Sequence, residues 1–141
     1  MNIILKNKLL NKLLKNGVKT HPEKILKLCI KQLQRKSKKK HLEILKKSLI
    51  NSSPVIAIKQ IKRRKKNVKE FPYILKKKLR LFFGLKFILR SLKLNKVNSF
   101  SKNFSDEILL TSLNKSNTIK LKKDLYEQSF QKKKYANFRW F

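Results

Sequence analysis

Hydrophobic side chains recur three and four positions apart along most of this chain. Leu9, Leu10, Leu13 and Leu14 form the first such stripe, with polar residues between them. Residues at this spacing lie on one face of a helix, so each stripe predicts an amphipathic helix. The stripes predict six helices, at about 2–15, 21–36, 40–51, 76–94, 104–114 and 120–134.

The hydrophobic period changes between the third and the fourth predicted helix. Residues 55–58 and 68–75 are short, apolar and partly β-branched runs, separated by a polar and strongly basic segment. Two such runs around a polar tip predict a β-hairpin at about 55–75. Pro72 cannot donate a ladder hydrogen bond, so it must lie on an edge or at a bulge. We therefore expect a mainly α fold, a single domain over residues 1–141 with a basic β-hairpin arm between the third and fourth helices.

Capping signals place two helix starts. Thr20 and Glu23 have the spacing of a capping box, which predicts that the Thr20 side chain caps the second helix. Residues 95–103 are rich in Asn, Ser and Lys and predict a loop. Asp106 and Glu107 then fall in the first turn of the fifth helix, where acidic side chains are favoured.

Two small residues, Gly84 and Cys29, indicate how the predicted helices pack. Gly84 lies inside the fourth helix, where glycine costs about 1 kcal/mol relative to alanine. We expect a close approach of another segment at this position. Cys29 lies on the apolar face of the second helix and has no second cysteine to pair with, so it is expected to be a buried thiol.

Composition points to a polyanionic partner. The chain has 39 Lys and Arg against 7 Asp and Glu, a formal net charge of +32 on 141 residues. Because 40% of the residues are hydrophobic, the chain is not a disordered tail. This charge favours nucleic acid first and an anionic membrane surface second.

The residues that usually carry catalysis are scarce. His21 and His41 have no cysteine or carboxylate partner at ligand spacing, and the seven acids are scattered along the chain. No glycine-rich phosphate loop is present, and no apolar run approaches the ~18 residues that a membrane span needs. We expect no enzymatic activity, no metal site, no cofactor and no membrane span.

Positive charge is concentrated in and after the hairpin. Between Lys59 and Arg80 the chain has eleven basic residues and one acid, Glu70. A solvated loop would explain the charge but not its concentration, so contact with RNA is the preferred interpretation. Lys76 and Lys78 oppose the helix dipole at the start of the fourth helix, which phosphate would relieve, although long side chains covering a core are an alternative.

Several segments, in the family's order and spacing, resemble the family of small-subunit ribosomal protein seven. Residues 15–20, followed by Glu23, are similar to the family's Asp-Gly-Lys-Lys-Ser with its later Glu, and Lys19 holds a matching place. Residues 54–58 and 71–76 are similar to the family's Pro-x-Val-Glu-Val and Val-Pro-Val-Glu-Val-Arg strands. Residues 119–124 are similar to its Val-Lys-Lys-Arg-Glu-Asp, and the ending at 135–140, Tyr-Ala-Asn-Phe-Arg-Trp, to its Phe-Ala-His-Tyr-Arg-Trp. The glycine pair at the family's hairpin tip is replaced by residues 65–67.

The resemblance implies a structural constituent of the small ribosomal subunit that binds ribosomal RNA in the head and helps it fold. The hairpin would lie near the exit-site tRNA and messenger RNA, and neighbouring head proteins would be further partners. The same resemblance and the basic clusters predict these RNA-binding residues: Lys19, Lys62, Arg63, Arg64, Lys65, Lys66, Lys76, Lys78, Arg80, Lys86, Lys120, Lys122, Lys123, Arg139 and Trp140. Trp140 has an alternative role in packing against its own domain.

Location and two other functions stay open on sequence alone. Abundant Lys, Asn, Ile and Phe, all with A/T-rich codons, and a start that reads as mature protein favour an organelle-encoded copy on a mitochondrial ribosome, with a plastid-type organelle as the alternative. A general nucleic-acid-compacting protein would explain the charge but not the ordered segments. A membrane-active protein would use the basic amphipathic helix at 1–15.

Overall fold

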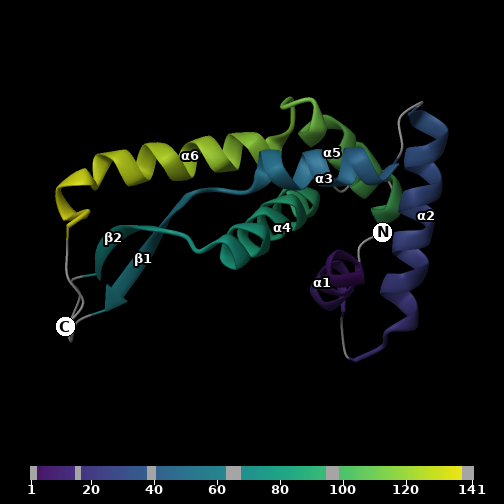
Figure 1. The fold of residues 1–141 in the computed structure, drawn as a ribbon, viewed down its shortest axis with the longest axis horizontal. Helices are drawn as coiled ribbons and strands as arrows, with labels where there is room; N and C mark the ends of the chain where they lie inside the picture. The colour runs from purple at the N-terminus through teal and green to yellow at the C-terminus, as the bar shows by residue number, and fades with distance from the viewer. Residues whose placement is uncertain (1–2, 15–16, 38–40, 63–67, 95–98, 138–141) are drawn as a thin grey trace.

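The computed structural model describes residues 3–14, 17–37, 41–62, 68–94 and 99–137 (Figure 1). Within these residues the chain forms six α-helices and a two-stranded antiparallel sheet, so the predicted mainly α fold with a hairpin between the third and fourth helices is confirmed. The elements are α1 (Ile3–Leu13), α2 (Thr20–Lys36), α3 (His41–Ser52), β1 (Ile56–Lys62), β2 (Val68–Ile74), α4 (Lys77–Leu94), α5 (Phe100–Ser112), α6 (Asn117–Gln131) and a 3-10 helix η1 (Lys133–Tyr135).

One hydrophobic core holds five of the helices together. Leu33 of α2, Leu49 of α3, Ile88 of α4 and Phe104 of α5 are all buried in it, and α1 adds Leu9. The core lies at one end of the molecule, and α6 runs away from it beside the hairpin (Figure 1). The apolar stripes of the sequence therefore face a common interior, and the helix surfaces between them carry the charge.

The thiol of Cys29 belongs to this core, as expected. Its side chain is 1% exposed. Burial, with a smaller contribution from the Asp106 carboxylate, raises the pKa of Cys29 to about 12. The thiol is therefore protonated at neutral pH and packs as a small apolar group.

The capping box predicted at Thr20 is wrong. Thr20 is already helical, and the cap position is Lys19, whose φ of −74° and ψ of −28° are helical and whose side chain makes no capping bond. Backbone geometry explains the error: the helical turn extends one residue further back, so the Thr20 hydroxyl does not stand in the flanking conformation that capping needs.

The fifth helix begins earlier than predicted. Residues 100–103, assigned to a loop by their polar composition, are helical, while 95–98 lie outside the described residues. Phe100 and Phe104 are one turn apart with stacked rings, 6.0 Å between centroids, and this pair stabilises the first turn of α5. Asp106 and Glu107 consequently lie in the middle of α5 and not in its first turn.

The close approach predicted at Gly84 is confirmed. A Cβ atom at this position would lie 2.8 Å from Ser52 Oγ and 3.2 Å from the backbone nitrogen of Ser53. Gly84 thus lets α4 cross the end of α3 at a distance that a larger residue does not allow. This crossing sets the position of α4 relative to the segment that leads into the hairpin.

Gly84→Ala is expected to lower the free energy of unfolding by about 1–2 kcal/mol, because the clash outweighs the gain in helix propensity. Denaturant unfolding followed by circular dichroism measures this change. Ser52→Ala added to Gly84→Ala removes the nearest clashing atom and should restore part of the loss. Equal or higher stability of Gly84→Ala would contradict the close crossing of α3 and α4.

Candidate nucleic-acid interface

The hairpin is a regular antiparallel ladder, and most of it lies within the basic segment from Lys59 to Arg80. Its register runs from Ile56 opposite Ile74 to Lys62 opposite Val68. Pro72 lies opposite Ile58 in this ladder, and each strand of a two-stranded sheet is an edge strand, so the edge position expected for Pro72 is confirmed. This regular pairing fixes the positions of the backbone from which the basic side chains of the hairpin extend.

The base of the hairpin is tied to α6. The backbone N–H of Val55 donates a hydrogen bond to the hydroxyl of Tyr126, with 3.0 Å between the atoms. One turn earlier on α6, Lys122 Nζ donates to the carbonyl oxygen of Asn51 at 2.7 Å. These two bonds fix the segment that joins α3 to β1 against the side of α6.

A second set of contacts holds the middle of the hairpin. The carboxylate of Glu70 on β2 forms an ion pair with Lys132 at the end of α6 and accepts a hydrogen bond of 2.7 Å from Gln60 Nε2 on β1. Phe71 is buried, and its ring meets Tyr135 of η1 edge to face, with 5.6 Å between centroids. The end of α6 therefore fixes the direction in which the arm projects (Figure 1).

A buried carboxylate holds the start of α6. Glu107 on α5 is 3% exposed and accepts hydrogen bonds from the backbone N–H of Thr118, at 3.2 Å, and from its Oγ1, at 2.6 Å. An acidic group is favourable at a helix N-terminus, where amide groups lack partners within the helix. Thr111 Oγ1 donates to Ser116 Oγ at 3.0 Å and completes the turn between α5 and α6. Sequence analysis assigned Glu107 to the start of its own helix and missed this role, because the contact depends on a turn between two helices.

The predicted cations at the start of α4 divide into exposed and engaged groups. Lys76 and Lys78 are exposed, and their ammonium groups have no partner among the described residues. Arg80 is partly buried, and its Nε donates to the carbonyl oxygen of Leu75 at 3.0 Å. Lys86 is exposed in the middle of α4, and its Nζ lies 5.8 Å from the ring centroid of Phe83. Arg80 therefore also stabilises the turn from β2 into α4.

The three predicted lysines of α6 divide in the same way. Lys120 and Lys123 are exposed. Lys122 is partly buried, donates to Asn51 as described above, and burial lowers its pKa from the ordinary value. Lys120 and Lys123 thus present their charges to solvent, while the charge of Lys122 serves the contact between α6 and α3.

The remaining predicted residues are distant or undescribed. Lys19 is exposed at the start of α2, which lies at the opposite end of the molecule from the hairpin, so it does not join this surface (Figure 1). Lys62 ends β1, but its side chain is outside the described part of the structure. The same is true of Arg63, Arg64, Lys65, Lys66, Arg139 and Trp140.

Two further exposed lysines lie in the basic segment, although neither is among the predicted RNA-binding residues. Lys69 is exposed on β2, and Lys77 is exposed in the first turn of α4. Both lie within the basic segment from Lys59 to Arg80, and that charge count was the signal that could have found them. Lys76, Lys77 and Lys78 are three consecutive exposed lysines beside the base of the hairpin, and we call them the hairpin-base surface. Lys69 lies opposite Ile61, near the other end of the ladder.

We also searched the described residues for a metal site and for a helix that could span a membrane. Among them, no three His, Cys, Asp or Glu side chains are placed to hold a metal ion. None of the described helices has the length and hydropathy needed to cross a membrane.

Comparison with known proteins gives the same protein family for a family model and for individual relatives. The family model for ribosomal protein S7p/S5e matches residues 2–133. "Small ribosomal subunit protein uS7c" of Euglena gracilis is 29% identical to this chain, over 99% of the chain and 88% of that protein. "Small ribosomal subunit protein uS7" of Thermotoga petrophila is 25% identical, over 97% and 88%, and that of Kosmotoga olearia is 24% identical, over 99% and 89%. The resemblance inferred from the sequence is confirmed.

Tyr126→Phe tests the tie between α6 and the hairpin base. Without the hydroxyl, the N–H of Val55 loses its acceptor, a loss of about 1 kcal/mol. We expect hydrogen exchange of this amide to become about fivefold faster, measured by NMR or mass spectrometry. Tyr73→Phe is the matched control, because the described structure gives the Tyr73 hydroxyl no hydrogen bond. Equal exchange in the two variants would show that Tyr126 does not hold the hairpin.

Proposed function

We propose, because this chain belongs to the ribosomal protein S7p/S5e family, that it binds small-subunit ribosomal RNA in the head of the subunit and helps that RNA to fold. Membership in this family makes it a small-subunit ribosomal protein of a structural, non-enzymatic kind. We further propose that its hairpin lies near the exit-site tRNA and the messenger RNA, with head proteins as neighbours.

The observation that carries this proposal is the hairpin-base surface. Its lysines are exposed, and α4 has no acidic residue along its length to pair with them. Unpaired lysines repel one another, and they do so less when phosphate groups neutralise them. The contacts of Tyr126, Lys132 and Tyr135 hold the hairpin in one direction. Because the hairpin is already ordered, binding to RNA would cost it little conformational entropy.

The mechanism follows from the chemistry of lysine. Each ammonium group placed against a phosphate releases condensed counterions, which gives affinity that falls steeply with salt. Lysine contacts of this kind position a protein on RNA without reading bases. Recognition then depends on the spatial arrangement of the cations, which the core, α6 and the hairpin ladder fix.

For location, we propose an organellar ribosome. The A/T-rich coding composition supports an organelle genome, and one relative is of the plastid type. Neither observation supports the mitochondrion over a plastid-type organelle, so the sequence-based preference for the mitochondrion has no support from the comparisons.

Lys76→Gln with Lys78→Gln tests the proposed RNA contact. We expect binding to a small-subunit head RNA fragment to weaken by on the order of tenfold per lysine near 0.1 M salt, with the slope of log affinity against log salt reduced by about two. Arg80 is avoided because its hydrogen bond to Leu75 would mix stability with binding. Filter binding or anisotropy across a salt series measures both quantities.

The matched control is Lys27→Gln with Lys31→Gln, two exposed lysines one turn apart on α2. Its slope should stay close to that of the unmodified protein. Equal losses in both double variants, or equal affinity of the unmodified protein for duplex DNA and for the head RNA, would replace the proposal with a general nucleic-acid binder.

A further inference from the structure

The exposed face of α4 carries an aromatic ring between two lysines. Phe82 is 41% exposed, and Lys78 and Lys86 are exposed four positions before and four positions after it. Side chains four positions apart lie on the same face of a helix, so the three form one row. This row starts in the hairpin-base surface, to which Lys78 belongs. Phe82 itself is not among the predicted RNA-binding residues.

A lysine of another helix reaches the same ring. Lys12 of α1 is exposed, and its Nζ lies 3.6 Å from the centroid of the Phe82 ring, which is a cation–π contact. The ring is 41% exposed even with this ammonium group over one of its faces. Two helices that are far apart in the sequence thus bring cations to one exposed ring. We call Lys12, Lys78, Phe82 and Lys86 the α4 ring site.

Other aromatic side chains support the exposed ring from within the helix. Phe82 meets Phe83 edge to face, with 6.0 Å between centroids, and Phe83 meets Phe87 in the same way at 6.5 Å. Phe87 is buried. A ring held by packing loses little side-chain entropy when a partner covers it, so Phe82 presents a surface that is already ordered for stacking.

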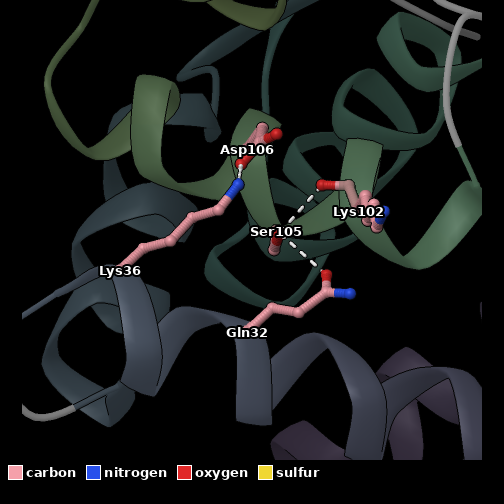
Figure 2. A network of polar contacts seen from close by, with 5 residues as sticks. All are labelled: Gln32, Lys36, Lys102, Ser105 and Asp106. Atoms are coloured by element: carbon pink, nitrogen blue, oxygen red, sulfur yellow. Dashed lines mark hydrogen bonds and ion pairs between the residues drawn. The ribbon is translucent and has the colours of Figure 1, made fainter.

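The lysines around this ring lack acidic partners. Elsewhere in the molecule a lysine can be neutralised within the fold, and Figure 2 shows Lys36 of α2 reaching across to Asp106 of α5 in an ion pair. In contrast, the helices α1 and α4 contain no acidic residue. Within the part of the chain that the structure describes, no ion pair involves Lys12, Lys78 or Lys86. An external anion would therefore meet ammonium groups without acidic partners beside an apolar ring.

The two kinds of group in the α4 ring site match the two parts of a nucleotide. A flat base stacks on an aromatic ring, and the phosphates on either side of that base are neutralised by lysine. Bases inside an RNA double helix are already stacked on one another, and the narrow major groove keeps protein side chains from them. The matching ligand is therefore a nucleotide from a loop, a bulge or another single-stranded segment.

We propose that Phe82 is a stacking platform for an unpaired base of small-subunit ribosomal RNA. The ammonium groups of the α4 ring site lie against the phosphates that flank this base. The site adds a contact to a base, next to the hairpin-base surface, whose lysines contact only phosphate. This inference rests on the proposed function, since it takes the RNA from the small subunit.

Phe82→Leu tests the stacking contact, because leucine keeps an apolar side chain and removes the flat ring. We expect the affinity for a small-subunit head RNA fragment to fall on the order of tenfold. The slope of log affinity against log salt should stay unchanged, because no phosphate contact is lost. Phe82→Trp should restore the affinity. Affinity for a fully paired RNA duplex of the same length should be equal for Phe82→Leu and the unmodified protein.

The matched control is Phe100→Leu, since Phe100 is 42% exposed on α5 and lies outside the α4 ring site. Its affinity for the head RNA should equal that of the unmodified protein. Unchanged affinity of Phe82→Leu, a loss equal to that of Phe100→Leu, or an equal loss on the paired duplex overturns the inference. The last result would assign Phe82 a role in stability and not in stacking.

Fluorescence gives a second readout. Phe82→Trp combined with Trp140→Phe leaves one tryptophan, at position 82, and a base stacked on it quenches its emission. We expect strong quenching when the head RNA binds, and little in Phe100→Trp combined with Trp140→Phe. Equal quenching in the two variants overturns the inference. Failure of the proposed function is distinguishable, because the unmodified protein would then bind duplex DNA as tightly as the head RNA.

Discussion

Mutual repulsion among 39 basic residues is the constraint on which the rest of this structure depends. At the ionic strength of a cell, charges within about 8 Å of each other are only partly screened, so a compact chain with seven acids must hold itself together by other means. The apolar core supplies most of that stability. Three acids among the described residues then act between elements: Glu70 joins β2 to the end of α6, Asp106 joins α5 to α2, and Glu107 holds the start of α6.

The placement of these acids divides the surface into two kinds. In the middle of the hairpin the acid Glu70 is already engaged by Lys132, and the exposed lysines at the start of α4 have no acidic partner among the described residues. At the end of α2, Lys36 pairs with Asp106 of α5, so this charge is balanced within the fold. A surface of unpaired lysines suits a phosphate backbone.

The parts of the fold that were predictable from sequence are those set by local spacing. Six helices, the hairpin, the buried Cys29 and the close approach at Gly84 follow from hydrophobic period, turn residues and the cost of glycine in a helix. The start of α5 was not predictable from composition, because the pairing of Phe100 with Phe104 overrides a polar segment. The fold class was therefore predicted more reliably than the ends of the helices.

Within the candidate site, sequence identified which segments are basic but not which cations are free. Lys78 and Arg80 are two positions apart in the chain, yet one is exposed and the other is bonded to Leu75. The same distinction separates Lys123 from Lys122, whose partner Asn51 is distant in sequence. Such pairings depend on tertiary contacts between α6, α3 and the hairpin, and a count of charges carries no information on them.

We propose that the RNA of the small ribosomal subunit neutralises the positive surface of this chain. Sedimentation of the native protein from an organelle lysate, on gradients at low and at moderate salt, tests it most directly. If RNA neutralises this surface, the protein migrates with the small subunit at both salt concentrations. Protein at the top of the gradient at moderate salt, or migration with DNA or membranes, would contradict it.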